Sequence, residues 1–553
     1  MMRRRFSHFI GATVMTLVMT GVGVASAAGA SAPAALLVQT DQGAVRGVTR
    51  EGVDDFLGIP FAAPPVGDLR FKPPQPAHAW SGVREADQYG SRCPQQANPT
   101  GPKSDTEDCL FVNVQRPAGT RPAQRLPVHV YIHQGGFVRD AASNYNMDTI
   151  VRANNTIGVT INYRLGVFGF LGLPGLTAQQ GESGNYGFQD QQAALRWVQS
   201  NIAAFGGDPA QVTIGGNSAG GWSACGHLVA PHSHGLFSQA MIQSGGCSSR
   251  TQAQAETTGR AFAVKAGCTN PATMVTCLRG LPAARLVEAS SSSGFTAHLV
   301  SGTPTLPEDL RQAIHEGNFA RVPVVIGTTH DEFRSRPSGL IGWTRQRYEN
   351  WVRTAFGSNG PAVSAHYPWP ASADQFTAAY LVEAIFTDSD AYSGGFADPG
   401  EWYNGSGFSG CDNRRLTKDF SRHTRTYAYE WSPDAVSPGP VYVPGFANGA
   451  AHLSDLAYLW PSFTTDGVAV ASRFDPADWS LSRKVVRYWG AFVKKGQPNV
   501  PRQMNWPPYT ATSGHRLLLQ TAQSMVIDDA AYVAEHQCTL WDGLPGISVS
   551  WPK

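Results

Sequence analysis

The fold is decided by "QVTIGGNSAGGWSA" at residues 211–224. β-branched residues lead to a pair of glycines, Ser218 lies between Gly216 and Gly220, and a segment compatible with a helix follows. A strand that turns sharply into a helix needs small residues two positions either side of its central residue, because strand and helix pack closely there. The pattern predicts a G-x-S-x-G nucleophile elbow, which holds a serine hydroxyl at a helix N-terminus where amides favour a developing oxyanion.

The segments around this elbow alternate between strand and helix patterns. Runs rich in Val, Ile and Tyr predict buried strands at residues 126–133, 156–163, 211–216, 237–246, 322–329 and 424–431. Residues 187–207, "GFQDQQAALRWVQSNIAAFGG", space apolar residues as a helix does and end in glycines. We therefore expect an α/β fold with a large, mostly parallel central sheet. Two stretches rich in Gly and Ser, 290–295 and 393–410, are predicted to be loops.

The first residues are typical of an exported protein. A basic start at residues 3–5 precedes an apolar stretch at 9–25 and the sequence Ala-Ser-Ala at 25–27, which predicts a signal peptide over residues 1–27. An uncleaved membrane anchor is the less favoured alternative, because the apolar run is short. The export route, Sec or twin-arginine, stays open. The mature chain, residues 28–553, is expected to be a single domain without a stable membrane span, secreted to the extracellular or periplasmic space.

Composition limits the partners of this chain. It has 553 residues, of which 42% are hydrophobic and 15% charged, as in ordinary globular proteins. Its formal net charge is +2 and no basic run follows residue 5, so nucleic acid is not an expected ligand. We expect a monomer or weak homo-oligomer that acts on a small molecule.

Eight cysteines in an exported chain predict disulfides, and no C-x-x-C motif points to zinc or to a redox dithiol. Sequence alone leaves the pairing open. The short-loop pairs Cys93–Cys109 and Cys268–Cys277 are the first that we expect.

An elbow serine predicts further parts, namely an acid and then a histidine, with an amide-rich loop upstream. The loop candidate is "HQGGF" at residues 133–137, directly after a predicted strand. His452 stands in the Gly- and Ala-rich segment "GFANGAAHLSDLAYLW". Asp331 and Glu332 follow the strand in "VVIGTTHDEF", and spacing does not choose between them.

Several ordered blocks resemble one family. They are "FLGIPFAAPPVGDLRFKPP" (56–74), "EDCLFVNVQRP" (107–117), "NYRLGVFGFL" (162–171), "GNYGFQDQQAALRWVQSNIAAFGGDP" (184–209), the amide loop, the elbow, "GTTHDEF" and "GAAHLSDLAYLW". Over residues 36–542 the chain resembles the type-B carboxylesterases, the cholinesterase-like branch of the α/β-hydrolases. The resemblance implies an α/β-hydrolase fold whose loop insertions form a gorge.

The resemblance also implies roles for single residues. The catalytic residues would be Ser218, Glu332 and His452, and the oxyanion amides those of Gly135, Gly136 and Ala219. Ser244 would donate a hydrogen bond to Glu332, and the ion pairs Arg70–Glu107 and Arg164–Asp190 would be structural. The family's bridges match Cys93–Cys109, Cys268–Cys277 and Cys411–Cys538, which leaves Cys225–Cys247 as an inferred fourth.

Two positions depart from the family pattern. Gln134 replaces a glycine of the usual H-G-G-G loop, so we expect a narrower or more polar entrance to the oxyanion hole. Asn217 replaces the usual Glu before the nucleophile, which removes a negative charge that would favour cationic substrates.

The expected function is that of a secreted serine carboxylesterase that hydrolyses neutral, small to medium esters through an acyl-enzyme, with no metal or cofactor. The alternatives are a lipase-like or specialised esterase (aromatic, toxin or choline ester) on the same scaffold, and, less favoured because the triad is intact, a catalytically silent binding protein.

Overall fold

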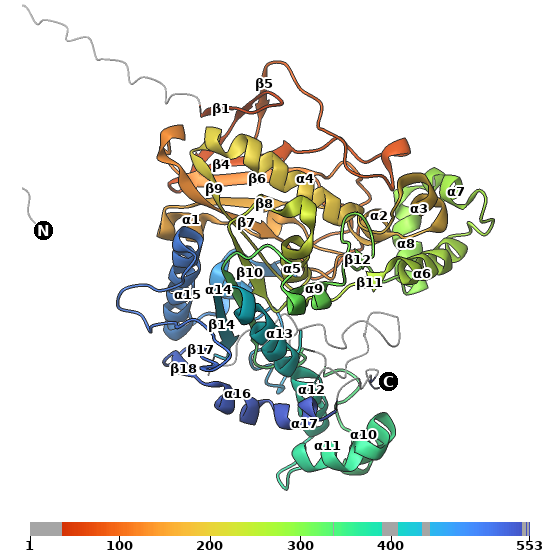
Figure 1. Ribbon diagram of the computed structural model, residues 1–553, viewed down its shortest axis with the longest axis vertical. Helices are drawn as coiled ribbons and strands as arrows, with labels where there is room; N and C mark the ends of the chain where they lie inside the picture. The colour runs from red at the N-terminus through yellow and green to blue at the C-terminus, as the bar shows by residue number, and fades with distance from the viewer. Residues whose placement is uncertain are drawn as a thin grey trace, which may run out of the picture. The chain divides into compact units, whose positions relative to one another are not determined.

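Strands from both halves of the chain form one eleven-stranded sheet (Figure 1). In order across the sheet they are β18 (Met525–Ile527), β17 (Arg516–Leu519), β14 (Thr426–Trp431), β13 (Val324–Thr329), β10 (Gln239–Gln243), β9 (Gly207–Asn217), β7 (Leu126–Ile132), β8 (Ile157–Ile161), β6 (Phe111–Pro117), β4 (Val53–Pro60) and β3 (Val48–Arg50). The strands from β17 to β8 are parallel to one another, and β18, β6, β4 and β3 each pair antiparallel.

This is a computed structural model, and it describes residues 36–335, 337–389, 408–433, 443–544, 549 and 552. These residues belong to a unit that begins at Leu36. The expected signal peptide and most of the loop expected at 393–410 lie outside the described residues.

Among the residues described here, three small sheets accompany the large one. They consist of β1 (Leu37–Gln39), β2 (Ala44–Arg46) and β5 (Val83–Glu85); of β11 (Arg250–Thr251) and β12 (Val300–Ser301); and of β15 (Thr464–Thr465) and β16 (Val468–Ala469).

The α-helices are α1 (Asp148–Asn154), α2 (Gly166–Phe170), α3 (Pro174–Gln180), α4 (Tyr186–Asn201), α5 (Ala219–Val229), α6 (Gln252–Lys265), α7 (Met274–Gly280), α8 (Ala283–Ser293), α9 (Leu310–Glu316), α10 (Arg345–Phe356), α11 (Gly360–His366), α12 (Thr377–Asp388), α13 (Gly410–His423), α14 (Leu456–Leu459), α15 (Pro476–Lys495), α16 (Asp529–Glu535) and α17 (Cys538–Asp542). Short 3-10 helices are η1 (Gly67–Leu69), η2 (Pro122–Gln124), η3 (Ala142–Asn144), η4 (Ile202–Phe205), η5 (Pro231–Ser233), η6 (Gly357–Asn359) and η7 (Val470–Arg473).

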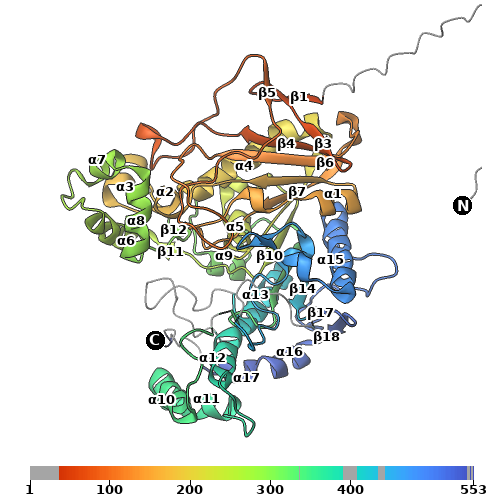
Figure 2. The same cartoon turned by 180° about the vertical axis from the view of Figure 1, so that it is seen from behind.

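The sheet is buried on both faces. In β7, Val128, Val130 and Ile132 belong to a core that includes residues of α4, α5 and α13. The intervening Tyr131 belongs to a second core with residues of α1, α14 and α15. Successive side chains of a strand point to opposite faces, so this alternation assigns the two groups of helices to opposite sides of the sheet. Figures 1 and 2 show α1 and α15 side by side on one of them.

The structure confirms the predicted strands, which correspond to β7, β8, β9, β10, β13 and β14. The predicted helix is confirmed as α4 followed by η4, which ends at Gly206 in a left-handed conformation.

The loop prediction for residues 290–295 is wrong, because α8 continues to Ser293 and only Gly294 ends it. Leu286, Val287 and Ala289 are buried on one face of this helix. The serine hydroxyls bond back to the helix, as Ser291 Oγ does to the carbonyl of Val287 at 3.2 Å. Burial of the apolar face outweighs the weak helix propensity of serine.

The cysteines form four disulfides, namely Cys93–Cys109, Cys225–Cys247, Cys268–Cys277 and Cys411–Cys538. A search of the described residues finds no helix with the length and apolar character needed to cross a membrane.

Candidate active site

The elbow serine stands between β9 and α5. Ser218 follows Asn217, the last residue of β9, and has φ 54° and ψ −121°. A positive φ is uncommon outside glycine and is held here by its surroundings, since the Ser218 amide donates to the Gln243 carbonyl at 2.9 Å. Phe137 and Leu453, next to other candidate site residues, also have positive φ.

The two elbow glycines are required by a close approach to β7. A Cβ on Gly216 would lie 2.4 Å from the Ile132 carbonyl oxygen, and one on Gly220 would lie 2.0 Å from the same atom. Strand β9 and helix α5 therefore both pack against the end of β7 at a distance that only glycine permits.

Glu332 and His452 are in direct contact. Nδ1 of His452 lies 2.6 Å from Oε2 of Glu332, and Oε1 of Glu332 accepts from the Thr329 amide at 2.9 Å. Asp331 faces elsewhere, since Oδ2 accepts from the Ala450 amide at 2.8 Å and Oδ1 pairs with Arg334. With Nδ1 held by a carboxylate, Nε2 of His452 is available as a base.

Ser218 Oγ makes no hydrogen bond to any described residue. Hydrogen bonds between a nucleophile and its base often tighten only when substrate binds.

Three amides near the serine are available. Within the described chain the N–H groups of Gly135, Gly136 and Ala219 have no hydrogen-bond partner, and no side chain caps α5. Gly135 and Gly136 have φ 108° and 60°, and a Cβ on Gly135 would lie 2.2 Å from the Arg139 carbonyl oxygen. A tight glycine turn beside a helix N-terminus suits a negatively charged oxygen.

The two departures from the family pattern are both buried. Gln134 donates to Oδ2 of Asp140 at 2.9 Å, so its amide nitrogen is engaged inside the protein. Asn217 donates to Oδ1 and Oδ2 of Asp455 at 3.3 and 3.4 Å.

The expected hydrogen bond from Ser244 to Glu332 is not formed. Ser244 has φ 42° and its amide donates to the Gly327 carbonyl at 2.8 Å, but Oγ is buried without a partner among the described residues. Both carboxylate oxygens of Glu332 are already engaged by Thr329 and His452.

Asp455, which contacts the residue before Ser218, was not predicted from the sequence. Burial, and secondarily the nearby charge of Glu332, raise the pKa of Asp455 to about 6, while His452 and a hydrogen bond from Gln243 oppose this. Its signal in the sequence was a single acid three residues after His452, at the start of the apolar segment "LAYLW".

A row of uncharged rings runs between the histidine and the amide loop. Ring centroids are 5.1 Å apart for His452 and Phe408, 5.8 Å for Phe408 and Trp222, 5.6 Å for Trp222 and His298, and 6.4 Å for His298 and Phe137. Burial lowers the pKa of His298 to about 3, so this imidazole is neutral. The row offers apolar and aromatic contacts between His452 and the amide loop.

Buried ion pairs brace the strands that hold the site. Arg164 after β8 bonds Asp190 of α4 through Nε and Nη2, each at 2.7 Å, and both side chains are at most 2% exposed. Arg70 forms the same kind of bidentate ion pair with Glu107, through Nε and Nη2.

The sequence and the fold of this chain are similar to those of known esterases. The sequence profile of the Carboxylesterase family matches residues 34–541. Carboxylesterase 1D of Rattus norvegicus is 32% identical over 551 residues, covering 90% of this chain and 93% of that protein. Para-nitrobenzyl esterase of Bacillus subtilis (strain 168) is 31% identical over 508 residues, covering 88% of this chain and 95% of that protein. A solved structure of a PNB esterase superimposes with a TM-score of 0.73 at 28% identity, covering 90% of this chain and 99% of that one. The chain therefore belongs to the Carboxylesterase family of α/β-hydrolases and is a carboxylic ester hydrolase.

Proposed function

We propose that the protein hydrolyses neutral, small to medium carboxylic esters through an acyl-enzyme on Ser218, with His452 as base and Glu332 as the acid that orients it. The observation that carries this proposal is the 2.6 Å contact between Nδ1 of His452 and Oε2 of Glu332, which leaves Nε2 to accept the serine proton.

The first half-reaction forms the acyl-enzyme. His452 Nε2 takes the proton of Ser218 Oγ, and that oxygen bonds to the ester carbonyl carbon. The carbonyl oxygen becomes an oxyanion that accepts from the amides of Gly135, Gly136 and Ala219. The carbon–oxygen bond to the alcohol then breaks, and the alcohol leaves with the proton from His452. Water repeats the sequence and releases the acid.

Neutral substrates are favoured by the surroundings of the serine. The residue before Ser218 is the uncharged Asn217, and the rings of Phe408, Trp222 and His298 are neutral contacts. Burial of apolar ester groups against such rings is favourable at about 25 cal/mol per Å².

We also propose that the chain is exported, for which its basic and apolar start and the four disulfides are the support.

The triad is tested with the variant Ser218→Ala. The control is Ser292→Ala on α8, which also removes a serine hydroxyl. We expect Ser218→Ala to lower kcat for p-nitrophenyl butyrate by about 10⁴-fold or more and to abolish labelling by diisopropyl fluorophosphate, whereas Ser292→Ala behaves as the parent. Substantial turnover by a folded Ser218→Ala protein would refute the assignment.

The substrate class is tested by comparing butyrylcholine with 3,3-dimethylbutyl butyrate, its neutral carbon isostere. We expect kcat/KM for the neutral ester to equal or exceed that for the choline ester. A choline preference of about tenfold or more, equivalent to about 1.4 kcal/mol, would contradict the neutral-ester proposal and leave the triad intact.

A further inference from the structure

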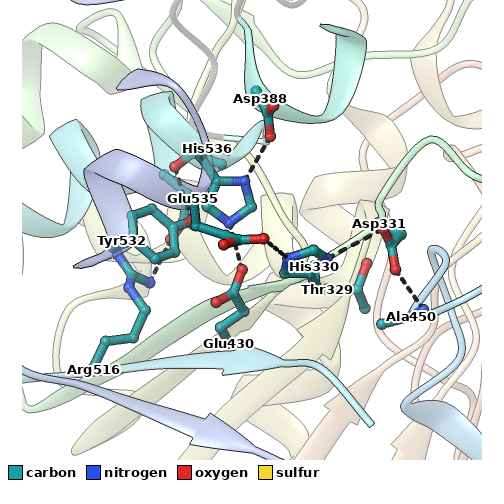
Figure 3. Close-up of polar contacts among 12 residues, drawn as sticks. Thr329, His330, Asp331, Asp388, Glu430, Ala450, Arg516, Tyr532, Glu535 and His536 are labelled. Carbon is teal, nitrogen blue, oxygen red and sulfur yellow. Dashed lines mark hydrogen bonds and ion pairs between the residues drawn. The ribbon is translucent and has the colours of Figure 1, made fainter. Parts of the chain in front are cut away.

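Two histidines outside the triad face each other near the carboxyl ends of β13 and β14. His330 directly follows β13 and His536 directly follows α16, and their ring centroids are 5.3 Å apart. Two carboxylates, Glu430 of β14 and Glu535 of α16, point between the rings (Figure 3). Three segments far apart in the sequence, namely the end of β13, strand β14 and the end of α16, thus bring nitrogen and oxygen donors close together.

The donor atoms lie close to one another. Nε2 of His536 lies 2.5 Å from Oε1 of Glu430, and Nε2 of His330 lies 3.2 Å from Oε1 of Glu535. Ligand atoms of His330, Glu430 and His536 all lie within 4.8 Å of one another. Tetrahedral Zn²⁺, with bonds of about 2.0–2.2 Å, needs ligand atoms about 3.3–3.5 Å apart. The Glu430 and His536 atoms are closer together than this and would have to separate, and Glu535, which lies outside this group of three, would join it by rotation of its exposed side chain.

The second nitrogen of each ring is also held by a carboxylate. Nδ1 of His536 lies 2.6 Å from Oδ1 of Asp388, and Nδ1 of His330 lies 3.2 Å from Oδ1 of Asp331. Zinc-binding histidines commonly donate their other N–H to a carboxylate, which fixes the tautomer and aims the free nitrogen at the metal. Both histidines meet this condition, so both Nε2 atoms are oriented toward the shared centre.

Charge also balances for a divalent cation. Without metal, each close contact between an Nε2 atom and a carboxylate oxygen needs one proton between the two atoms. One Zn²⁺ replaces the two protons with no change in net charge, so the buried Glu430 and His536 stay compensated. Access is available, because the Glu535 side chain is 63% exposed and that of His330 is 28% exposed.

We propose that His330, Glu430, Glu535 and His536 bind one Zn²⁺ per chain, with Asp331 and Asp388 orienting the two imidazoles. Binding forms two zinc–nitrogen and two zinc–oxygen bonds and releases two protons to solvent. The site joins β13, β14 and α16 near Glu332, and Asp331 also holds the Ala450 amide two residues before His452. Its role is therefore to brace the segments that carry the acid and the base. The ester hydrolysis described above takes place without zinc in the reaction path.

The test uses the whole mature chain without a polyhistidine tag, stripped with a chelator and titrated with Zn²⁺ by calorimetry in buffers of different ionisation enthalpy. We expect one site per chain, about two protons released per metal, and a higher melting temperature with zinc. Tetrahedral Co²⁺ absorption is an independent readout of the donor set.

Glu535→Gln removes an exposed ligand and should leave the fold intact, and we expect it to weaken zinc binding by about tenfold or more. His330→Gln should weaken it further. His315→Gln is the matched control, because His315 also pairs with a carboxylate, Asp419 at 3.2 Å, but belongs to no group of three potential metal ligands among the described residues. It should bind zinc as the parent does. The proposal is overturned if the parent chain binds no stoichiometric zinc, or if Glu535→Gln and His330→Gln bind it as tightly as His315→Gln does.

Discussion

Gly220→Ala tests whether the elbow depends on a rigid close approach. The new Cβ would lie 2.0 Å from the Ile132 carbonyl oxygen, whereas such contacts in proteins are essentially never under 3.0 Å. Either the start of α5 or the end of β7 must therefore move by about 1 Å. Ala219 is the first residue of α5, and Gly135 and Gly136 follow β7. Either movement separates the amides that we assign to one oxyanion.

Two effects of opposite sign determine how Gly220→Ala changes the stability of the protein. Alanine in a helix is favoured over glycine by about 1 kcal/mol, while overpacking of a rigid site costs about 1–3 kcal/mol. The net loss of stability is thus at most about 2 kcal/mol. A displacement of about 1 Å at reacting groups costs about 10²-fold in rate. Activity is therefore the sensitive readout.

The assay is kcat for p-nitrophenyl butyrate, with thermal unfolding measured on the same samples. The matched control is Gly280→Ala at the end of α7, where a Cβ would meet no atom within 4 Å. We expect Gly220→Ala to lose about 10²-fold in kcat, and Gly280→Ala to keep full activity with equal or slightly higher stability. Full activity of Gly220→Ala would refute the argument from close packing.

Three further outcomes are expected. Replacing both Cys411 and Cys538 by Ser should lower the free energy of unfolding by about 5 kcal/mol, and the same change at Cys268 and Cys277 by about 2.5–3 kcal/mol. The difference is expected because the first bridge closes a loop of 127 residues and the second a loop of 9. Equal losses in urea unfolding would contradict the loop-entropy argument. Arg164→Ala should cost about 3–5 kcal/mol, since it strands the buried charge of Asp190, while the exposed control Arg285→Ala should cost under about 0.5 kcal/mol. The pKa of Asp455 is about 6 in the folded protein and 3.8 in the unfolded chain. Between these pH values the unfolded chain binds fewer protons than the folded one. The free energy of unfolding therefore falls as pH rises from about 4 to about 6, by at most about 3 kcal/mol. Asp455→Asn should remove this slope from the free energy of unfolding, and an unchanged slope would show that another group causes it.

The local sequence was sufficient for the elements that carry the site. Each predicted strand has a dense run of β-branched and aromatic residues, and each is buried on both faces in the sheet, which is the condition that such runs satisfy. The elbow glycines were likewise predictable, since the need for small residues is local to the turn. Residues 290–293 were not, because burial of Leu286 and Val287 against the rest of the protein is a tertiary effect.

Contacts between distant segments could not be predicted from the residues alone. Spacing left Asp331 and Glu332 as equal candidates, and the difference between them arises from which side chain the turn after β13 aims at His452 and which it aims at Arg334. His330 and His536 are 206 residues apart, and no motif with fixed spacing links them. They meet because the fold brings the end of α16 to the ends of β13 and β14.

Asp455 changes the meaning of Asn217. From the sequence, Asn217 removes a negative charge beside the nucleophile; in the fold, its amide donates to a buried carboxylate instead. Gln243 donates to the same carboxylate at 3.2 Å. Two side-chain amides donate to the Asp455 carboxylate, and burial disfavours its charged form. The negative potential that Asp455 exerts on a substrate is therefore reduced. A glutamate at position 217 would place a second negative charge next to Asp455. The neutral Asn217 avoids this repulsion and donates a hydrogen bond to Asp455 instead. The preference for neutral esters that we propose thus depends on both residues.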